Sequence, residues 1–231
     1  IDESEGLIRM ITLSPEWEGS TAFIEKCVES GILVSIGHTN ASHEKIMEAV
    51  QTGARLSTHL GNGMHSIIAR HPNYLWSQLA AENLSATIIA DGFHLPAEVI
   101  QVFKKVKAEK LILVSDSVAL AGMHPGNYEA AVGGKVTLTA KGKLHLFGNP
   151  NTLSGSAMNI LQGINFLLKN NLVELPEAWQ MASIRPQSLF ETSFDPFQLG
   201  QKANLIFAEQ QPNHSLKILK VLKNGTEIPL D

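Results

Sequence analysis

Short apolar runs that alternate with amphipathic stretches are the feature that most restricts how this 231-residue chain can fold. Runs rich in Ile, Leu and Val predict strands at residues 7–13, 32–36, 55–60, 85–90 and 111–115. Helical spacing of apolar residues appears between them, at 20–30, 42–52, 73–82 and 96–108. A strand followed by one crossover helix favours parallel pairing with the helices outside, so the pattern predicts an α/β fold.

The pattern changes after residue 125. The stretch "YEAAVGGKVTLTAKGKLHLFG" alternates and contains Gly-Gly and Lys-Gly turns, which predicts antiparallel hairpins inserted over about 126–148. Helices are expected at 156–169 and 175–190, followed by a few strands with a turn at Asn224-Gly225. We therefore expect a main domain over 1–192 and part of a small β domain over 193–231.

Charge and apolar content exclude several classes of partner. The net charge is −4 with no cluster of Lys and Arg, which argues against binding to nucleic acid or to an anionic membrane surface. The longest apolar runs, such as 110–115, are far too short to span a bilayer. Cys27 is the single cysteine, so no intrachain disulfide can form and a cytoplasmic location is expected. We expect its thiol to be buried on a helix as a small apolar group.

The N-terminus has no features of a signal peptide. "IDESEGLIRM" lacks a basic segment and a long apolar segment, and Ile1 is not a methionine. We therefore expect the chain to begin inside a longer protein.

Polar residues follow four of the predicted strands. His38 and His59 come after the second and third, Asp91 and His94 after the fourth, and Asp116 after the fifth. Since the carboxyl ends of parallel strands form one rim where ligands bind, these side chains are expected to converge. Imidazoles and carboxylates suit a divalent metal such as zinc, and a further carboxylate can act as general base toward water. The arrangement predicts a metal-dependent hydrolase.

Three other segments are candidates for binding. The glycine-rich loop "STHLGNGMHS" at 57–66 lets the backbone approach a ligand closely, and Arg70 beyond it matches an anionic group. The stretch 151–159 is expected at a helix start, where backbone N–H groups can meet a ligand. Ser154 and Ser156 have no general base and no G-x-S-x-G context, so neither is interpreted as a nucleophile.

Five motifs together resemble a known family. "GHTNAS", "THLGNGM", "ADGFH", "LVSDSVALAG" and "TLSGSAM", in this order, are similar to the N-acetylglucosamine-6-phosphate deacetylases of the amidohydrolase superfamily. The resemblance runs from about residue 11 to the C-terminus. It implies a (β/α)8 barrel of the TIM type, a small β-sandwich built from both chain ends, and a homodimer. Because only five βα units are present, we expect an N-terminal part of that barrel to be missing, including a metal-binding glutamate and a histidine that polarises the substrate carbonyl.

The resemblance also implies a role for each matching residue. His38 and His59 match the metal ligands, and Asp116 matches the catalytic acid/base. Substrate contacts are implied for Asn62, Gly63, Arg70, Asp91, Gly92, Phe93, His94, Leu153, Ser154 and Gly155, with Arg70 at the phosphate. Gly61, His65 and Asn204 depart from the residues usual in the family.

The expected activity is hydrolysis of the acetamide of N-acetylglucosamine 6-phosphate to glucosamine 6-phosphate and acetate, with zinc as cofactor. One alternative is another amidohydrolase acting on a related N-acyl amino sugar or a cyclic amide. Another is a non-catalytic fragment that binds sugar phosphates. A doubly wound nucleotide-binding fold ranks last because no G-x-G-x-x-G follows a predicted strand.

Overall fold

A parallel five-stranded sheet forms the centre of the protein. The computed structural model describes residues 1–131, 133–190 and 197–230. The sheet strands, hydrogen-bonded in chain order, are β1 (Met10–Leu13), β2 (Leu33–Ile36), β3 (Leu56–Ser57), β4 (Ser85–Ile89) and β5 (Leu111–Val114). The predicted strands and their parallel pairing are confirmed. β3 is much shorter than the predicted 55–60, because His59 turns away with φ of 29° and its backbone N–H donates to Thr87 Oγ1.

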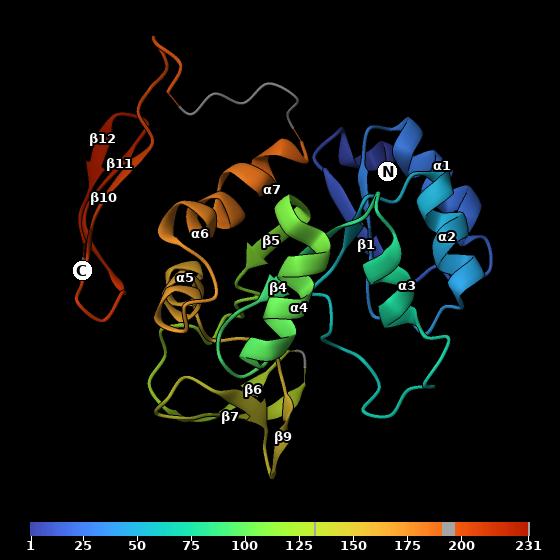
Figure 1. Cartoon of the computed structure of the whole chain (residues 1–231), viewed down its shortest axis with the longest axis horizontal. Helices are drawn as coiled ribbons and strands as arrows, with labels where there is room; N and C mark the ends of the chain where they lie inside the picture. Colours follow the sequence, from blue (N-terminus) through green and yellow to red (C-terminus); the bar gives the residue numbers. More distant parts are fainter. Residues whose placement is uncertain (132, 191–196, 231) are drawn as a thin grey trace.

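Helices connect the strands, as the alternation predicts (Figure 1). They are α1 (Ser20–Glu29), α2 (His43–Thr52), α3 (Tyr74–Ala80) and α4 (Ala97–Lys107), with short 3-10 turns η1 (Asp2–Ser4) and η2 (Ala108–Lys110). Ser42 caps α2 by accepting from Lys45 N, and Ile46, Ala49 and Val50 form its buried face. Cys27 is buried on α1, as expected. None of the described helices combines the length and the apolar character that crossing a lipid bilayer requires.

Two apolar clusters lie where helices cover the sheet. One gathers around Ile88 and Leu113 with side chains of α4, α5 and α6, and the other around Val34 and Ile36 with side chains of α1 and α2. Those four strand residues are at most 2% exposed. The core therefore holds the strand ends, and the polar residues that follow them, in fixed positions.

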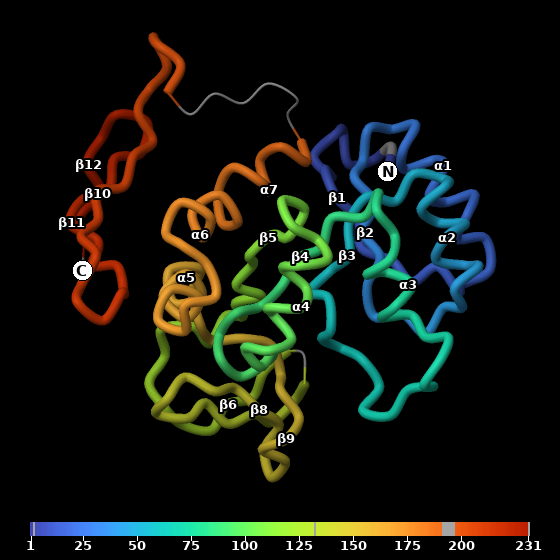
Figure 2. The backbone as a smooth tube through the Cα atoms, viewed as in Figure 1, coloured from blue at the N-terminus to red at the C-terminus, as the bar shows by residue number. Residues whose placement is uncertain are grey.

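An antiparallel four-stranded sheet follows β5. Its strands are β6 (Gly126–Ala130), β7 (Gly134–Leu138), β8 (Leu144–Leu146) and β9 (Asn149–Leu153), paired in chain order. Figure 2 shows this sheet at one end of the molecule, below β4 and β5. The predicted hairpins are confirmed, but their end at 148 is wrong, because β9 extends the sheet to Leu153.

The helices after this sheet differ from the prediction in two places. α5 (Ile160–Lys169) begins four residues later than predicted, since Asn159 caps it in a capping box with Gln162. Leu153, Ser154 and Gly155 therefore do not lie at a helix start. The predicted helix at 175–190 is divided into α6 (Leu175–Ala182) and α7 (Ile184–Ser188), because Ser183 leaves helical geometry with φ of −131° and ψ of −71°.

The C-terminal strands form a small antiparallel sheet. They are β10 (Leu205–Gln210), β11 (Leu216–Lys223) and β12 (Thr226–Ile228), and the predicted turn at Asn224-Gly225 joins the last two. Leu216 is buried in the main core, and its backbone N–H donates to Asn165 Oδ1 of α5 at 2.7 Å. The predicted domain boundary at residues 192 and 193 lies outside the described residues.

Candidate active site

Strained backbone marks three of the predicted site residues. Each of them lies two positions after the end of a strand: His38 after β2, His59 after β3 and Asp116 after β5. Their φ angles are 50°, 29° and 49°. Residues other than glycine rarely adopt this region, and they keep it mainly where surrounding structure holds them for function. All three predicted metal and catalytic residues thus share an unusual conformation at one edge of the sheet.

His38 and His59 face one another. Their Nε2 atoms are 2.9 Å apart, and the rings meet at 88° with centroids 4.6 Å apart. His59 is 8% exposed, and its Nδ1 is buried with no hydrogen-bond partner among the described residues. Two imidazole nitrogens directed at one point are arranged as two ligands of a single ion would be.

The surroundings of His59 favour its neutral imidazole. Burial lowers the pKa of His59 below its ordinary value, and the charges of His38 and His94 lower it further, against the opposing effects of a backbone hydrogen bond and of Asp116. The neutral form is the one that binds a metal ion. The charges of His38, His94 and Asp116 all affect the pKa of His59, and His38 is in direct contact with it.

The donor set for a metal is incomplete. Within residues 1–131, 133–190 and 197–230, no group of three or more His, Cys, Asp or Glu side chains is arranged to hold an ion. His38 and His59 therefore fit part of a zinc coordination shell, and other ligands or water would have to complete it.

The glycine-rich loop packs its backbone against His38. Gly63 has φ of 63°, and a Cβ atom placed on it would lie 2.7 Å from His38 Nδ1. A small pocket beside this contact is lined by His38, Asn62, Gly63 and neighbouring residues. The side-chain Nδ2 of Asn62 is buried there without a hydrogen-bond partner in the described part of the chain. An unpaired donor beside a pocket is suited to an acceptor group of a ligand. His65, one of the residues that depart from the family, contacts the Tyr74 hydroxyl through Nδ1 at 3.0 Å.

Replacing Gly63 with alanine is expected to move the His38 ring. The methyl group would overlap the imidazole, and the positive φ would add strain of about 1–2 kcal/mol. We expect the G63A protein to unfold at a lower urea concentration than the wild type. Calorimetric titration should also show that it binds Zn²⁺ at least about ten-fold more weakly. G148A is the matched control, because Gly148 has φ of 75° and nothing within 4 Å of its added Cβ. Equal zinc affinity in both variants would contradict the contact.

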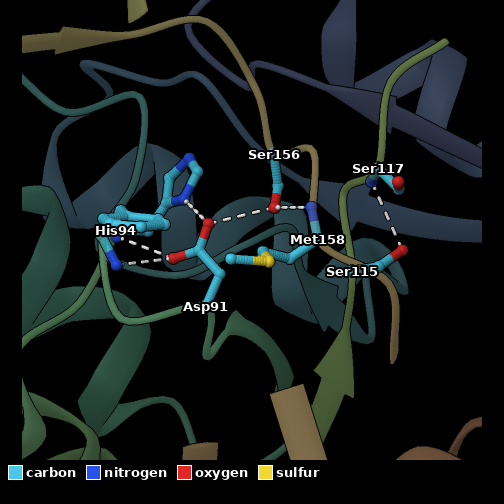
Figure 3. Close-up of polar contacts among 7 residues, drawn as sticks. Asp91, His94, Ser115, Ser117, Ser156 and Met158 are labelled. Carbon is cyan, nitrogen blue, oxygen red and sulfur yellow. Dashed lines mark hydrogen bonds and ion pairs between the residues drawn. The ribbon is translucent and has the colours of Figure 1, made fainter. Parts of the chain in front are cut away.

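Asp91 and His94 form a buried pair at the end of β4 (Figure 3). His94 Nδ1 lies 2.7 Å from Asp91 Oδ2, and the two side chains are 7% and 5% exposed. Asp91 Oδ1 accepts from the backbone N–H groups of Phe93 and His94 at 2.8 and 2.9 Å. Burial alone would raise the pKa of Asp91, but the hydrogen bonds from His94 and from the backbone outweigh it and lower the pKa to about 2.

Ser156 joins this pair to the Asp116 backbone. Its Oγ donates to Asp91 Oδ2 at 3.0 Å, and its backbone N–H donates to the Asp116 carbonyl at 3.2 Å. The Val118 N–H in turn donates to the Ser156 carbonyl at 2.9 Å. The sequence interpretation did not assign Ser156 a site role, although "TLSGSAM" was one of the motifs that carried the resemblance.

The remaining predicted substrate contacts lie around this network, with one exception. Leu153 ends β9, Ser154 N donates to the Leu144 carbonyl, and a Cβ on Gly155 would lie 2.6 Å from Val118. A Cβ on Gly92 would lie 2.9 Å from the Phe166 ring. Arg70 is exposed, and its side chain makes no hydrogen bond or ion pair with another predicted site residue in the described part of the chain.

Glu16 is a second residue that the interpretation did not assign to the site. Its carboxylate follows β1 and accepts from Thr39 Oγ1 at 2.6 Å and from Asn40 N at 2.8 Å. These bonds hold the loop that directly follows His38. The only signal for it in the sequence is its place just after the first strand, in "ITLSPE".

Comparison with known proteins agrees with the motifs. Over 205 residues the chain is 30% identical to the N-acetylglucosamine-6-phosphate deacetylase of Lysinibacillus sphaericus, a match that covers 88% of this chain and 52% of that protein. It is also 30% identical to an N-acetylgalactosamine-6-phosphate deacetylase of a Shewanella strain, over 80% of this chain and 46% of that one. The chain resembles the amino-sugar-phosphate deacetylases. The predicted resemblance is confirmed.

A solved structure agrees with the sequence relatives. N-acetylglucosamine-6-phosphate deacetylase from Pasteurella multocida superposes with a TM-score of 0.82 at 27% identity, covering 96% of this chain and 57% of that one. No protein-family model matches the chain. The chain spans about half the length of the curated relatives it matches.

Proposed function

We propose that this chain takes part in metal-dependent hydrolysis of N-acetylglucosamine 6-phosphate to glucosamine 6-phosphate and acetate. The observation that carries the proposal is the pair His38 and His59, which face each other at 2.9 Å in a chain similar to deacetylases of this substrate. His94 and Asp116 are near enough for their charges to affect the pKa of His59, which also supports the proposal.

Each site residue has a role in this reaction. His38 and His59 would hold a divalent metal, for which we propose zinc, and the bound ion supplies Lewis-acid chemistry. Asp116 takes a proton from the water that attacks the acetamide carbon and then gives it to the departing amine nitrogen as the C–N bond breaks. Asn62 Nδ2, a buried donor without a partner in the described structure, is available to bind an oxygen of the sugar phosphate. Arg70, exposed beyond the loop, would contact the phosphate.

We propose the wider architecture on the same basis. The five parallel βα units would form part of a (β/α)8 barrel over 1–192, with 193–231 contributing to a small β-sandwich. The whole protein would be a homodimer. A phosphorylated substrate and a single cysteine, Cys27, both favour a cytoplasmic location.

The test is metal content together with acetate release. The purified chain is analysed for zinc and other metals and assayed with N-acetylglucosamine 6-phosphate. Bound metal with acetate release, both lost in the H59A variant, supports the proposal. Acetate release from metal-free protein would overturn the mechanism, and absence of both metal and turnover would overturn the activity for this chain.

A second candidate substrate is N-acetylgalactosamine 6-phosphate. The Shewanella relative named for that sugar is as similar to this chain as the Lysinibacillus one, at 30% identity. The same assay with both sugars, compared by kcat/KM, separates the two. A ratio above about ten in favour of the galactosamine derivative would replace the first proposal, since the loss of one hydrogen bond worth about 1.4 kcal/mol produces a difference of that size.

A further inference from the structure

Asp91 was expected to contact substrate, but its carboxylate is fully occupied inside the protein. Oδ1 accepts from two backbone N–H groups, and Oδ2 accepts from His94 and from Ser156. A carboxylate offers about four lone-pair sites, so these bonds use all of them. The side chain is also only 5% exposed. A sugar hydroxyl therefore has neither a free acceptor nor access at this carboxylate.

The contact with His94 determines which ring nitrogen carries a proton. An ionised carboxylate can only accept, so the 2.7 Å contact with Oδ2 requires a proton on His94 Nδ1. When the ring is neutral, its Nε2 is then an acceptor. Figure 3 shows this second nitrogen on the side of the ring away from Asp91. No other described residue bonds to it, which leaves it available for a ligand.

The contact with Ser156 connects two segments that are far apart in the chain. Ser156 lies 65 positions after Asp91, and its backbone bonds to the carbonyl of Asp116. The same carboxylate thus holds both the end of β4 and the segment beside the proposed acid/base.

We propose that Asp91 is a positioning residue, which keeps His94 in the Nδ1–H tautomer so that Nε2 accepts a hydroxyl of the amino-sugar phosphate. Its second action is to hold Ser156, and with it the 153–158 segment, against the Asp116 backbone. This inference rests on the proposed function for the identity of the sugar and on the geometry alone for the tautomer.

The test is the exchange of Asp91 for asparagine. The amide oxygen can keep the two backbone bonds at Oδ1, which puts the NH2 group opposite His94 Nδ1 and forces that nitrogen to accept. The proton then moves to Nε2, although the shape of the site is unchanged. In serine proteases, the same exchange at the aspartate behind the catalytic histidine also leaves the geometry intact and gives the wrong tautomer.

Two readouts distinguish positioning from a purely structural role. Nitrogen-15 NMR of the imidazole rings reports the tautomer of His94 in the wild-type and D91N proteins without substrate. Calorimetric titration with N-acetylglucosamine 6-phosphate reports affinity. We expect a protonated Nδ1 in the wild type, a protonated Nε2 in D91N, and affinity about 10–100-fold weaker in D91N, because a substrate hydroxyl would be mispaired.

Control variants separate the two halves of the proposal. S156A removes the two bonds of Ser156 Oγ, the one it donates to Asp91 and the one it accepts from Met158 N, but it leaves the contact between Asp91 and His94. We therefore expect it to keep the wild-type tautomer and to lose less affinity than D91N. E227Q removes a negative charge at an exposed ion pair with Lys220 in the C-terminal sheet and is expected to change neither readout.

The outcomes can be told apart from failure of the proposed function. An unprotonated Nδ1 in the wild type overturns the proposal even if D91N does not fold, and so does a D91N protein with wild-type tautomer and affinity. If the wild type does not bind the sugar phosphate, the proposed function and the substrate half of this inference both fail. The NMR measurement still decides the tautomer in that case.

Discussion

Exchange of Asp116 for asparagine is expected to lower acetate release from N-acetylglucosamine 6-phosphate by about 10²–10⁴-fold, the usual contribution of a general acid/base. An amide cannot take the proton of the attacking water or return it to the amine. The Asp116 side chain is exposed and has no hydrogen-bond partner in the described residues. The free energy of unfolding of D116N should therefore lie within about 0.5 kcal/mol of the wild-type value. Acetate formation is followed in a coupled assay and substrate affinity by calorimetric titration.

The separation of binding from turnover is what makes this variant informative. Affinity for the sugar phosphate should stay within a few-fold, because the proton transfer occurs only after binding. E109Q, at an exposed position in η2, is the control and should release acetate at the wild-type rate. Acetate release by D116N close to the wild-type rate would show that another group handles the proton.

Exchange of Lys107 for methionine is expected to lower the free energy of unfolding by about 2–4 kcal/mol. Lys107 lies at the end of α4 and is 4% exposed, and its Nζ donates to the carbonyls of Gln78, Ala81 and Leu84 at 2.7–3.0 Å. Burial lowers the pKa of Lys107 to about 8, so the ammonium still carries its proton at neutral pH. Methionine fills similar space but leaves these buried carbonyls without that donor.

The measurement is urea unfolding followed by circular dichroism. K105M is the matched control, since Lys105 is on the same helix with its side chain exposed, and its unfolding free energy should change by less than about 0.5 kcal/mol. A loss below about 1 kcal/mol in K107M would mean that water or a backbone shift satisfies the three carbonyls.

Much of the main sheet could be predicted because its signals are local. The apolar runs at 32–36 and 111–115 contain the observed strands β2 and β5, and the helix cap at Ser42 follows from residue type alone. One error occurred where a tertiary contact overrides local preference: β3 ends at Ser57 because His59 N bonds to a side chain of the next strand. Another is local, since α6 ends at Ala182, where Ser183 leaves helical geometry.

The residues of the candidate site also divide into those that local sequence signals predicted and those that they did not. Placing polar residues after strands was enough to select His38, His59 and Asp116, and those three share positive φ angles in the structure. The expected substrate contact at Asp91 came from the resemblance, and the buried network around it supports a different role. Ser156 and Glu16 were not assigned because their partners are distant in sequence and their own residue types are common.

The sequence by itself determined the order and parallel direction of the strands, and which side chains follow their ends. The strand order and direction depend on the period of apolar residues and on the short connections that place consecutive strands side by side. Only the tertiary structure decided that His38 and His59 face each other, that the Asp91 carboxylate is closed to solvent, and that Lys107 reaches three carbonyls. Each of these contacts joins or encloses residues from different elements, so each depends on how the sheet and helices pack, which no local pattern of residues specifies.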